Sequence, residues 1–194
     1  MSFDRKPEVR AEIEKLTHTR IVAGVPLHDS YLQMIAGVNE NGAVITAKRQ
    51  WLTIPTAAAG TRKASEIPGL FKPKGKNILA VDNGGELTVM FILKKSVKIP
   101  PRPFIWTTRE KNRTKYARMV REGVIEIIHG KSTADILQHK LARTMANDIR
   151  ITLRDFFEPA NAPLTVERKG KNDPLMDTGK LIGSITWTFL GSGE

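Results

Sequence analysis

The chain has 194 residues, of which 40% are hydrophobic and 26% are charged. This is the composition of a folded globular protein and excludes a mainly disordered chain. The absence of cysteine excludes disulfide frameworks and thiolate metal sites, and the net charge of +11 is the one unusual bulk property. The N-terminus is charged, and no apolar run approaches the roughly 18 residues of a spanning helix. We therefore expect an intracellular protein with no membrane partner.

The first 54 residues predict two short helices and two extended segments. In chain order these are a helix over 7–17, a strand over 20–25, a helix over 31–38 and an extended segment over 43–54. The first helix is indicated by the helical spacing of Val9, Ile13 and Leu16. Ser30 is expected to cap the second helix, which ends at the turn over 39–42.

The middle of the chain predicts an exposed arm followed by a hairpin. Residues 55–77 are rich in Gly, Pro, Ala and Lys and show little periodicity, which is typical of an exposed loop or arm. Residues 78–93 predict a hairpin, because two apolar segments flank a turn with the sequence Asn83-Gly84-Gly85. The second strand is apolar on both faces, so we expect a helix or a neighbouring subunit to cover one face.

The remainder predicts two long helices and a final strand. Helical periodicity starts at Thr108, breaks at His129–Gly130 and resumes over Ala134–Phe157. Residues 184–190 predict the last strand, and no repeat or linker divides the chain. The predicted fold class is α+β: one domain over 1–194, with an antiparallel or mixed sheet packed by two long helices and an extended loop or hairpin arm.

Asp177-Thr178-Gly179 has the letters of the aspartic-protease triplet, in which two carboxylates share a proton. The context argues against that chemistry, because the triplet follows the polar stretch 167–174 and no second DTG or DSG exists. The alternative is structural. Asp177 is expected to cap a short turn over 180–182, and Gly179 to give the backbone the freedom to enter the strand.

The other short motifs also favour structural interpretations. Gly130–Thr133 resembles the end of a phosphate-binding loop, but Ile125 stands where that motif needs its first glycine. Ser132 and Asp135 instead resemble a helix capping box. The four histidines have no zinc-ligand spacing, and few aromatic residues interleave the basic segment. We expect no catalytic residue, no metal and no cofactor.

The positive charge is concentrated between Gly60 and Arg121. This segment holds fifteen Lys and Arg and four acids, a net +11 that equals the charge of the whole chain. Such a field attracts a polyanion or an acidic protein surface, unless it is only a solvated face. The sequence leaves open whether the partner is DNA or protein.

Three segments resemble the motifs of bacteriophage neck proteins, also called tail-completion, head–tail joining or virion-morphogenesis proteins. The residues that carry the resemblance are Tyr31, Ile35, Ala36, Asn39, Glu40 and Gly42, then Ile99, Pro100, Arg102, Pro103 and Phe104, then Pro174, Leu175, Asp177, Thr178, Gly179, Leu181, Ser184 and Ile185. The chain departs from the pattern at Asn41, where an aromatic residue is commoner, through an insertion over 56–76 and through its basic excess.

The resemblance implies a structural virion protein rather than an enzyme. Subunits of this kind form a ring, expected to be six-fold, at the head–tail junction or the top of the tail of a tailed phage, where it joins portal or head-completion proteins to the tail tube. The implied partners are further copies of the chain, other neck, portal or tail-tube proteins, and DNA in the channel. Most of the basic residues are then expected at the ring's contacts or outer surface and a minority near the lumen, with Arg109, Lys111, Arg113 and Lys115 as the candidate contacts. The alternatives are a basic DNA-binding accessory protein and, less favoured, an aspartic protease.

Overall fold

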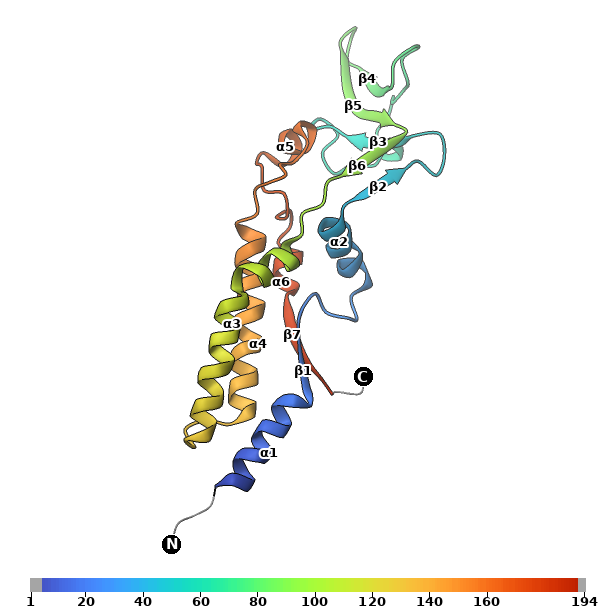
Figure 1. Cartoon of the computed structure of the whole chain (residues 1–194). Helices are drawn as coiled ribbons and strands as arrows, with labels where there is room; N and C mark the ends of the chain where they lie inside the picture. The colour runs from blue at the N-terminus through green and yellow to red at the C-terminus, as the bar shows by residue number, and fades with distance from the viewer. Residues whose placement is uncertain (1–4, 192–194) are drawn as a thin grey trace.

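An antiparallel pair of long helices is the main support of the molecule (Figure 1). The computed structural model describes residues 5–191. Helix α3 spans Phe104–Ile128 and α4 spans Ala134–Arg154. The helices pack closely at Gly123, where an added Cβ would lie 2.4 Å from a Leu137 methyl carbon. The sequence placed the break between the helices correctly, but α3 begins four residues before Thr108 and α4 ends three residues before Phe157.

A two-stranded antiparallel sheet lies against α4. It pairs β1 (Thr19–Gly24) with β7 (Thr186–Gly191). Helix α1 (Lys6–Thr17) packs near the far end of the helical pair, where the Glu12 carboxylate accepts a 2.6 Å hydrogen bond from the backbone N–H of Ala134. Together with the Lys15 ammonium, this hydrogen bond lowers the pKa of Glu12.

Three shorter helices complete this part of the molecule, which we call the body (residues 5–42 and 100–191). They are α2 (Ser30–Asn41), α5 (Pro163–Lys169) and α6 (Lys180–Ser184). The body core is built around Phe104, which is fully buried, and its other buried members are Ala36, Ala146, Ile149, Leu153, Leu175, Leu181 and Ile185. Phe104 therefore joins α3 to α2, α4 and the C-terminal segment.

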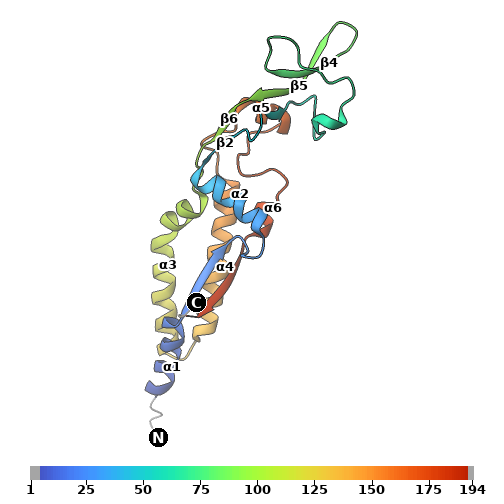
Figure 2. The ribbon, with the colours of Figure 1, turned by 90° about the vertical axis from the view of Figure 1, so that its right-hand side faces the viewer.

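Residues 43–99 form a second part, the head, which projects beyond the end of the helical pair (Figure 2). Strand β2 (Ala43–Thr46) pairs with β6 (Ser96–Ile99), and β5 (Leu87–Lys94) lies between β3 (Leu52–Pro55) and β4 (Ile78–Asp82). All these pairs are antiparallel. The α+β class is confirmed. The extended segment expected over 43–54 is two strands, because residues 47–51 bulge opposite the single residue Lys95.

The expected arm over 55–77 is only partly exposed. It contains the short 3-10 helix η1 (Ala64–Glu66), and its Ala59 and Ile67 are buried with Met90 and Phe91 of the hairpin. The arm therefore covers apolar residues of the hairpin that were expected to lie against a helix or a neighbouring subunit. Apolar loop residues bury readily against an apolar strand, which explains why this segment folds back.

Two helix caps differ from the sequence-based predictions. The cap of α2 is Asp29, whose carboxylate accepts from the Leu32 N–H, and Ser30 is the first helical residue. The cap of α4 is Thr133, whose hydroxyl accepts from the Ile136 N–H, in place of Ser132. Both corrections move the cap by one residue. Neighbouring Asp, Ser and Thr all serve as caps, so composition alone does not separate them.

Candidate interaction surfaces

The first two motif segments meet where the body joins the head. The Glu40 carboxylate, at the end of α2, accepts hydrogen bonds of 2.9 Å from the backbone N–H groups of both Ile105 and Trp106. These donors belong to the first turn of α3, whose N-cap residue Pro103 provides no side-chain cap. A carboxylate at this position also interacts favourably with the helix dipole. Glu40 is therefore the cap of α3, supplied from another helix.

Arg102 anchors the same junction from the inside. Its backbone N–H donates to the Asn39 carbonyl at 2.6 Å, and its side chain is only 5% exposed. The guanidinium donates from Nε to the Pro159 carbonyl at 2.8 Å and from Nη2 to the Ala160 carbonyl at 3.0 Å. Burial lowers the pKa of Arg102. The residue thus ties the start of α3 to the loop after α4.

Gly42 allows the chain to enter the head beside this anchor. Its φ of 72° lies in the left-handed region, and an added Cβ would lie 2.9 Å from both the Ile99 carbonyl oxygen and the Pro101 nitrogen. Only glycine combines that conformation with that approach. Pro100 and Pro103 restrict the returning chain, which leaves the head at Ile99 and begins α3 at Phe104.

The third motif segment faces the first across a cleft of about 270 Å³. Tyr31, Leu32, Ile35 and Asn39 line one side of it, and Pro174, Leu175 and Asp177–Leu181 line the other. The loop before the cleft is held by Lys169, whose ammonium donates to the carbonyls of Asp173 (2.7 Å) and Met176 (2.6 Å). Burial lowers the pKa of Lys169, although nearby carboxylates oppose the shift. All three motif segments thus meet at α2, the third along its length and the second at its end.

The predicted cap at Asp177 is wrong. The residue before α6 is Gly179, with φ of 76°, which has no side chain to cap the helix. Asp177 is exposed, and the Thr178 hydroxyl instead accepts a 3.4 Å hydrogen bond from the Lys180 N–H. Gly179 has the left-handed conformation that glycine permits, but it leads into α6 and not directly into the strand. Ser184 ends α6, where its hydroxyl donates to the Leu181 carbonyl, and β7 begins after it.

The four candidate contact charges on α3 are not equivalent. Lys115 donates to both oxygens of the buried Asp148 at 2.8 and 2.7 Å, and the Tyr116 hydroxyl donates to the same carboxylate at 3.0 Å. Burial, followed by this carboxylate, raises the pKa of Tyr116. Lys115 therefore serves the packing of α3 on α4. Arg109 is 4.0 Å from Glu110, whereas Lys111 and Arg113 form no ion pair within the described residues.

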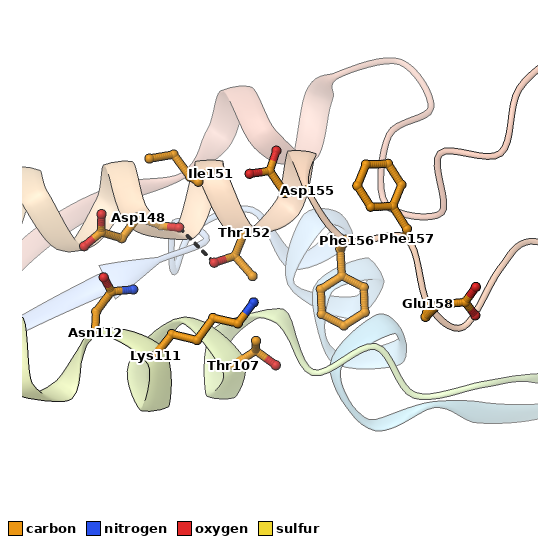
Figure 3. Close-up of a pocket in the computed structure, with 10 residues that line it drawn as sticks. All are labelled: Thr107, Lys111, Asn112, Asp148, Ile151, Thr152, Asp155, Phe156, Phe157 and Glu158. Atoms are coloured by element: carbon orange, nitrogen blue, oxygen red, sulfur yellow. Dashed lines mark hydrogen bonds between the residues drawn. The ribbon is translucent and has the colours of Figure 1, made fainter.

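A groove of about 600 Å³ lies between α3 and the end of α4 (Figure 3). Its lining residues are Thr107, Lys111, Asn112, Asp148, Ile151, Thr152, Asp155, Phe156, Phe157 and Glu158. Lys111 extends from α3 toward α4, and Phe157 is 58% exposed at the other end. Asp148 is already bound by Lys115 and Tyr116. The lining offers no His, Ser or Cys that could pair with a base, and its apolar and charged side chains suit a protein contact.

Neither metal ligation nor membrane spanning finds support in residues 5–191. No group of three or more His, Asp or Glu in this range is placed to hold a metal ion, and no helix in it is long and apolar enough to cross a bilayer. Comparison of the chain with protein-family models, curated proteins and solved structures gave no match.

Proposed function

We propose that this chain is a structural subunit of a ring at the head–tail junction of a tailed bacteriophage. In this proposal the ring, expected to be six-fold, joins portal or head-completion proteins to the tail tube. The observation that carries the proposal is the convergence of the three motif segments. Asn39 accepts a hydrogen bond from Arg102, Glu40 binds the two residues directly after Phe104, and α2 faces the segment of Pro174–Leu181. Residues that carry a shared structural role are expected to meet in this way.

The surface of the molecule supports a role in an assembly. The chain exposes 13004 Å², whereas a compact monomer of 21.6 kDa is expected to expose roughly 9,200 Å². The difference of about 3,800 Å² between these two exposed areas lies within the range of area that obligate interfaces bury. Large apolar side chains are also exposed on the body, among them Tyr31 (63%), Trp106 (58%) and Phe157 (58%). Neighbouring subunits would cover such surface in a ring.

In the proposed ring the subunit acts by shape and performs no covalent chemistry. Lys111 and Arg113 of α3 face a neighbouring ring, and Arg109 adds a weakly paired charge. Lys115 is left out of this contact because Asp148 holds it. The contacts of Arg102 with Asn39, Pro159 and Ala160 hold the start of α3 in place, directly after the chain returns from the head.

Removal of the coding sequence from the phage genome tests the proposal. The expected result is DNA-filled heads and complete tails that remain unattached when lysates are viewed by electron microscopy. Complementation with the intact chain should restore joined virions. Normal virions in the absence of the chain would contradict a role at the junction, and loss of heads or tails themselves would assign it to an earlier step.

A further inference from the structure

The head carries a dense and uncompensated positive charge. Residues 43–99 contain ten cationic side chains and three carboxylates, which gives a net charge of +7. The cations, all of them exposed, are Lys48, Arg49, Arg62, Lys63, Lys72, Lys74, Lys76, Lys94, Lys95 and Lys98. None of them forms an ion pair within residues 5–191. The head therefore attracts anions from outside the chain.

A second copy of this chain does not supply those anions. The rest of the chain carries the remaining net charge of +4, so contact between copies brings together surfaces that are on average of the same sign. Within the head, Lys95 and Lys72 lie 4.1 and 5.1 Å from the centre of the Trp51 ring. Two ammonium groups thus gather at one indole, and their mutual repulsion is relieved when an anion binds nearby.

The head cations are of a kind that binds anions without a fixed geometry. Eight of the ten are lysines, and the guanidinium of Arg62 already donates to the carbonyls of Ala58 and Ala59. The planar fork of arginine favours fixed bidentate contacts with carboxylate or phosphate, whereas lysine binds either group as a flexible point charge. The head cations stand mainly on loops over 47–51, 61–63 and 72–76. Many mobile point charges suit the regularly repeated phosphates of a duplex.

We propose that the head binds duplex DNA through its phosphate backbone, without reading the base sequence. In this proposal the cations of the head bind the genome, and the charges on α3 remain available for protein contacts. It does not depend on ring formation, because the cations belong to one subunit. Base-specific recognition is not part of the proposal, since loop lysines at phosphates position a protein without selecting a sequence.

Binding of a fluorescent duplex of about 30 base pairs, measured by anisotropy between about 50 and 200 mM salt, tests this proposal. The parent protein should bind duplexes of unrelated sequence equally, with an affinity that falls steeply with salt. The head variant replaces Lys63, Lys74 and Lys76 by Gln, because these side chains are exposed and form no ion pair within residues 5–191. Its affinity should fall on the order of tenfold or more, and its log–log salt slope should decrease by up to about 3.

The matched control replaces Lys131, Lys140 and Arg143 by Gln, which removes the same charge from the opposite end of the molecule (Figure 1). This control should bind the duplex nearly as the parent does. Equal losses in both variants would show that net charge alone is responsible and would overturn the proposal. Absence of duplex binding by the parent, or displacement of the duplex by poly-glutamate at equal charge, would also overturn it. The oligomeric mass of each variant, measured in the same samples, separates this result from the fate of the proposed ring.

Discussion

The carboxylate of Glu40 accepts a hydrogen bond of 2.9 Å from the backbone N–H of Trp106, 66 residues away, and so caps α3 from the end of α2. A second hydrogen bond from the Ile105 N–H completes the cap. The cap holds the start of the longest helix beside the exit to the head. A change at Glu40 should therefore affect the body and the head together.

Replacement of Glu40 by Gln should lower the free energy of unfolding by about 1–2 kcal/mol, because it removes the charge and one of two acceptors at the helix terminus. Chemical denaturation of the purified protein measures the effect. Glu167→Gln is the control, since Glu167 is an exposed acid on α5 with no side-chain partner in the described chain. A cost at Glu40 no larger than at Glu167 would mean that the cap contributes nothing.

Lys115 and Arg113 should differ sharply although they are two residues apart on α3. Lys115→Gln leaves the buried Asp148 with Tyr116 as its remaining side-chain donor, so we expect a loss of about 1–3 kcal/mol. Arg113→Gln should change the stability by less than about 0.5 kcal/mol, since its side chain is exposed and unpaired in the described chain. Thermal unfolding of the two variants makes the comparison.

Because Lys115 stabilises the fold, it is left out of the variant that tests the ring contacts. Combined neutralisation of Arg109, Lys111 and Arg113 should impair joining to a neighbouring ring without unfolding the subunit, and raised salt should imitate the defect in the parent. Co-sedimentation with the partner ring reports joining. If the triple variant joins normally at every salt concentration, the α3 charges are a solvated face.

Deletion of residues 56–76 should disorder the head and spare the body. The deletion removes Ala59 and Ile67, which cover Met90 and Phe91, so the hairpin loses its own core. Hydrogen exchange should accelerate in β4 and β5 while β1 and β7 keep their protection. Retention of slow exchange in β5 would show that the arm does not stabilise the hairpin, and any loss of assembly would then come from the arm itself.

Asp177 and Gly179 provide a test of the DTG triplet. Asp177→Asn should leave the stability within about 0.5 kcal/mol of the parent, because its side chain caps no helix. Gly179→Ala should cost about 1–2 kcal/mol, because alanine is strained at a φ of 76°. Both variants and the parent should give only background in a peptidase assay. Proteolysis by the parent that disappears in Asp177→Asn would restore the protease interpretation.

Local patterns in the sequence predicted the elements well. The apolar spacing located the long helices, and the Asn-Gly-Gly turn located the hairpin, with Gly84 and Gly85 at positive φ as that turn requires. These signals lie within a few residues of one another, so they can be read without knowledge of the fold. Cap positions were less accurate because neighbouring polar residues compete for the same role.

The long-range contacts that hold the helices and the junction together could not be predicted from local sequence patterns. Glu12 caps α4 across 122 residues, and Lys115 pairs with Asp148 across 33. Neither pair has a spacing that distinguishes it from many other charged pairs in the chain. Asp148 could have been noticed from the sequence alone, because it is an acid within α4, the helix with the apolar stripe. A carboxylate that is buried with such a stripe needs a partner. Arg102 drew notice through its motif, but its burial depends on the loop after α4.

Whether the chain forms a closed ring is decided by the oligomeric mass of the purified protein, measured by native mass spectrometry alone and then with the portal or tail-tube protein of the same phage. We expect a discrete closed oligomer, a hexamer, either from the chain alone or on contact with the partner ring. The same mass should appear across a range of protein concentrations once the ring has closed. A chain that stays monomeric in the presence of both partners, or that forms an open series of masses, would contradict the account.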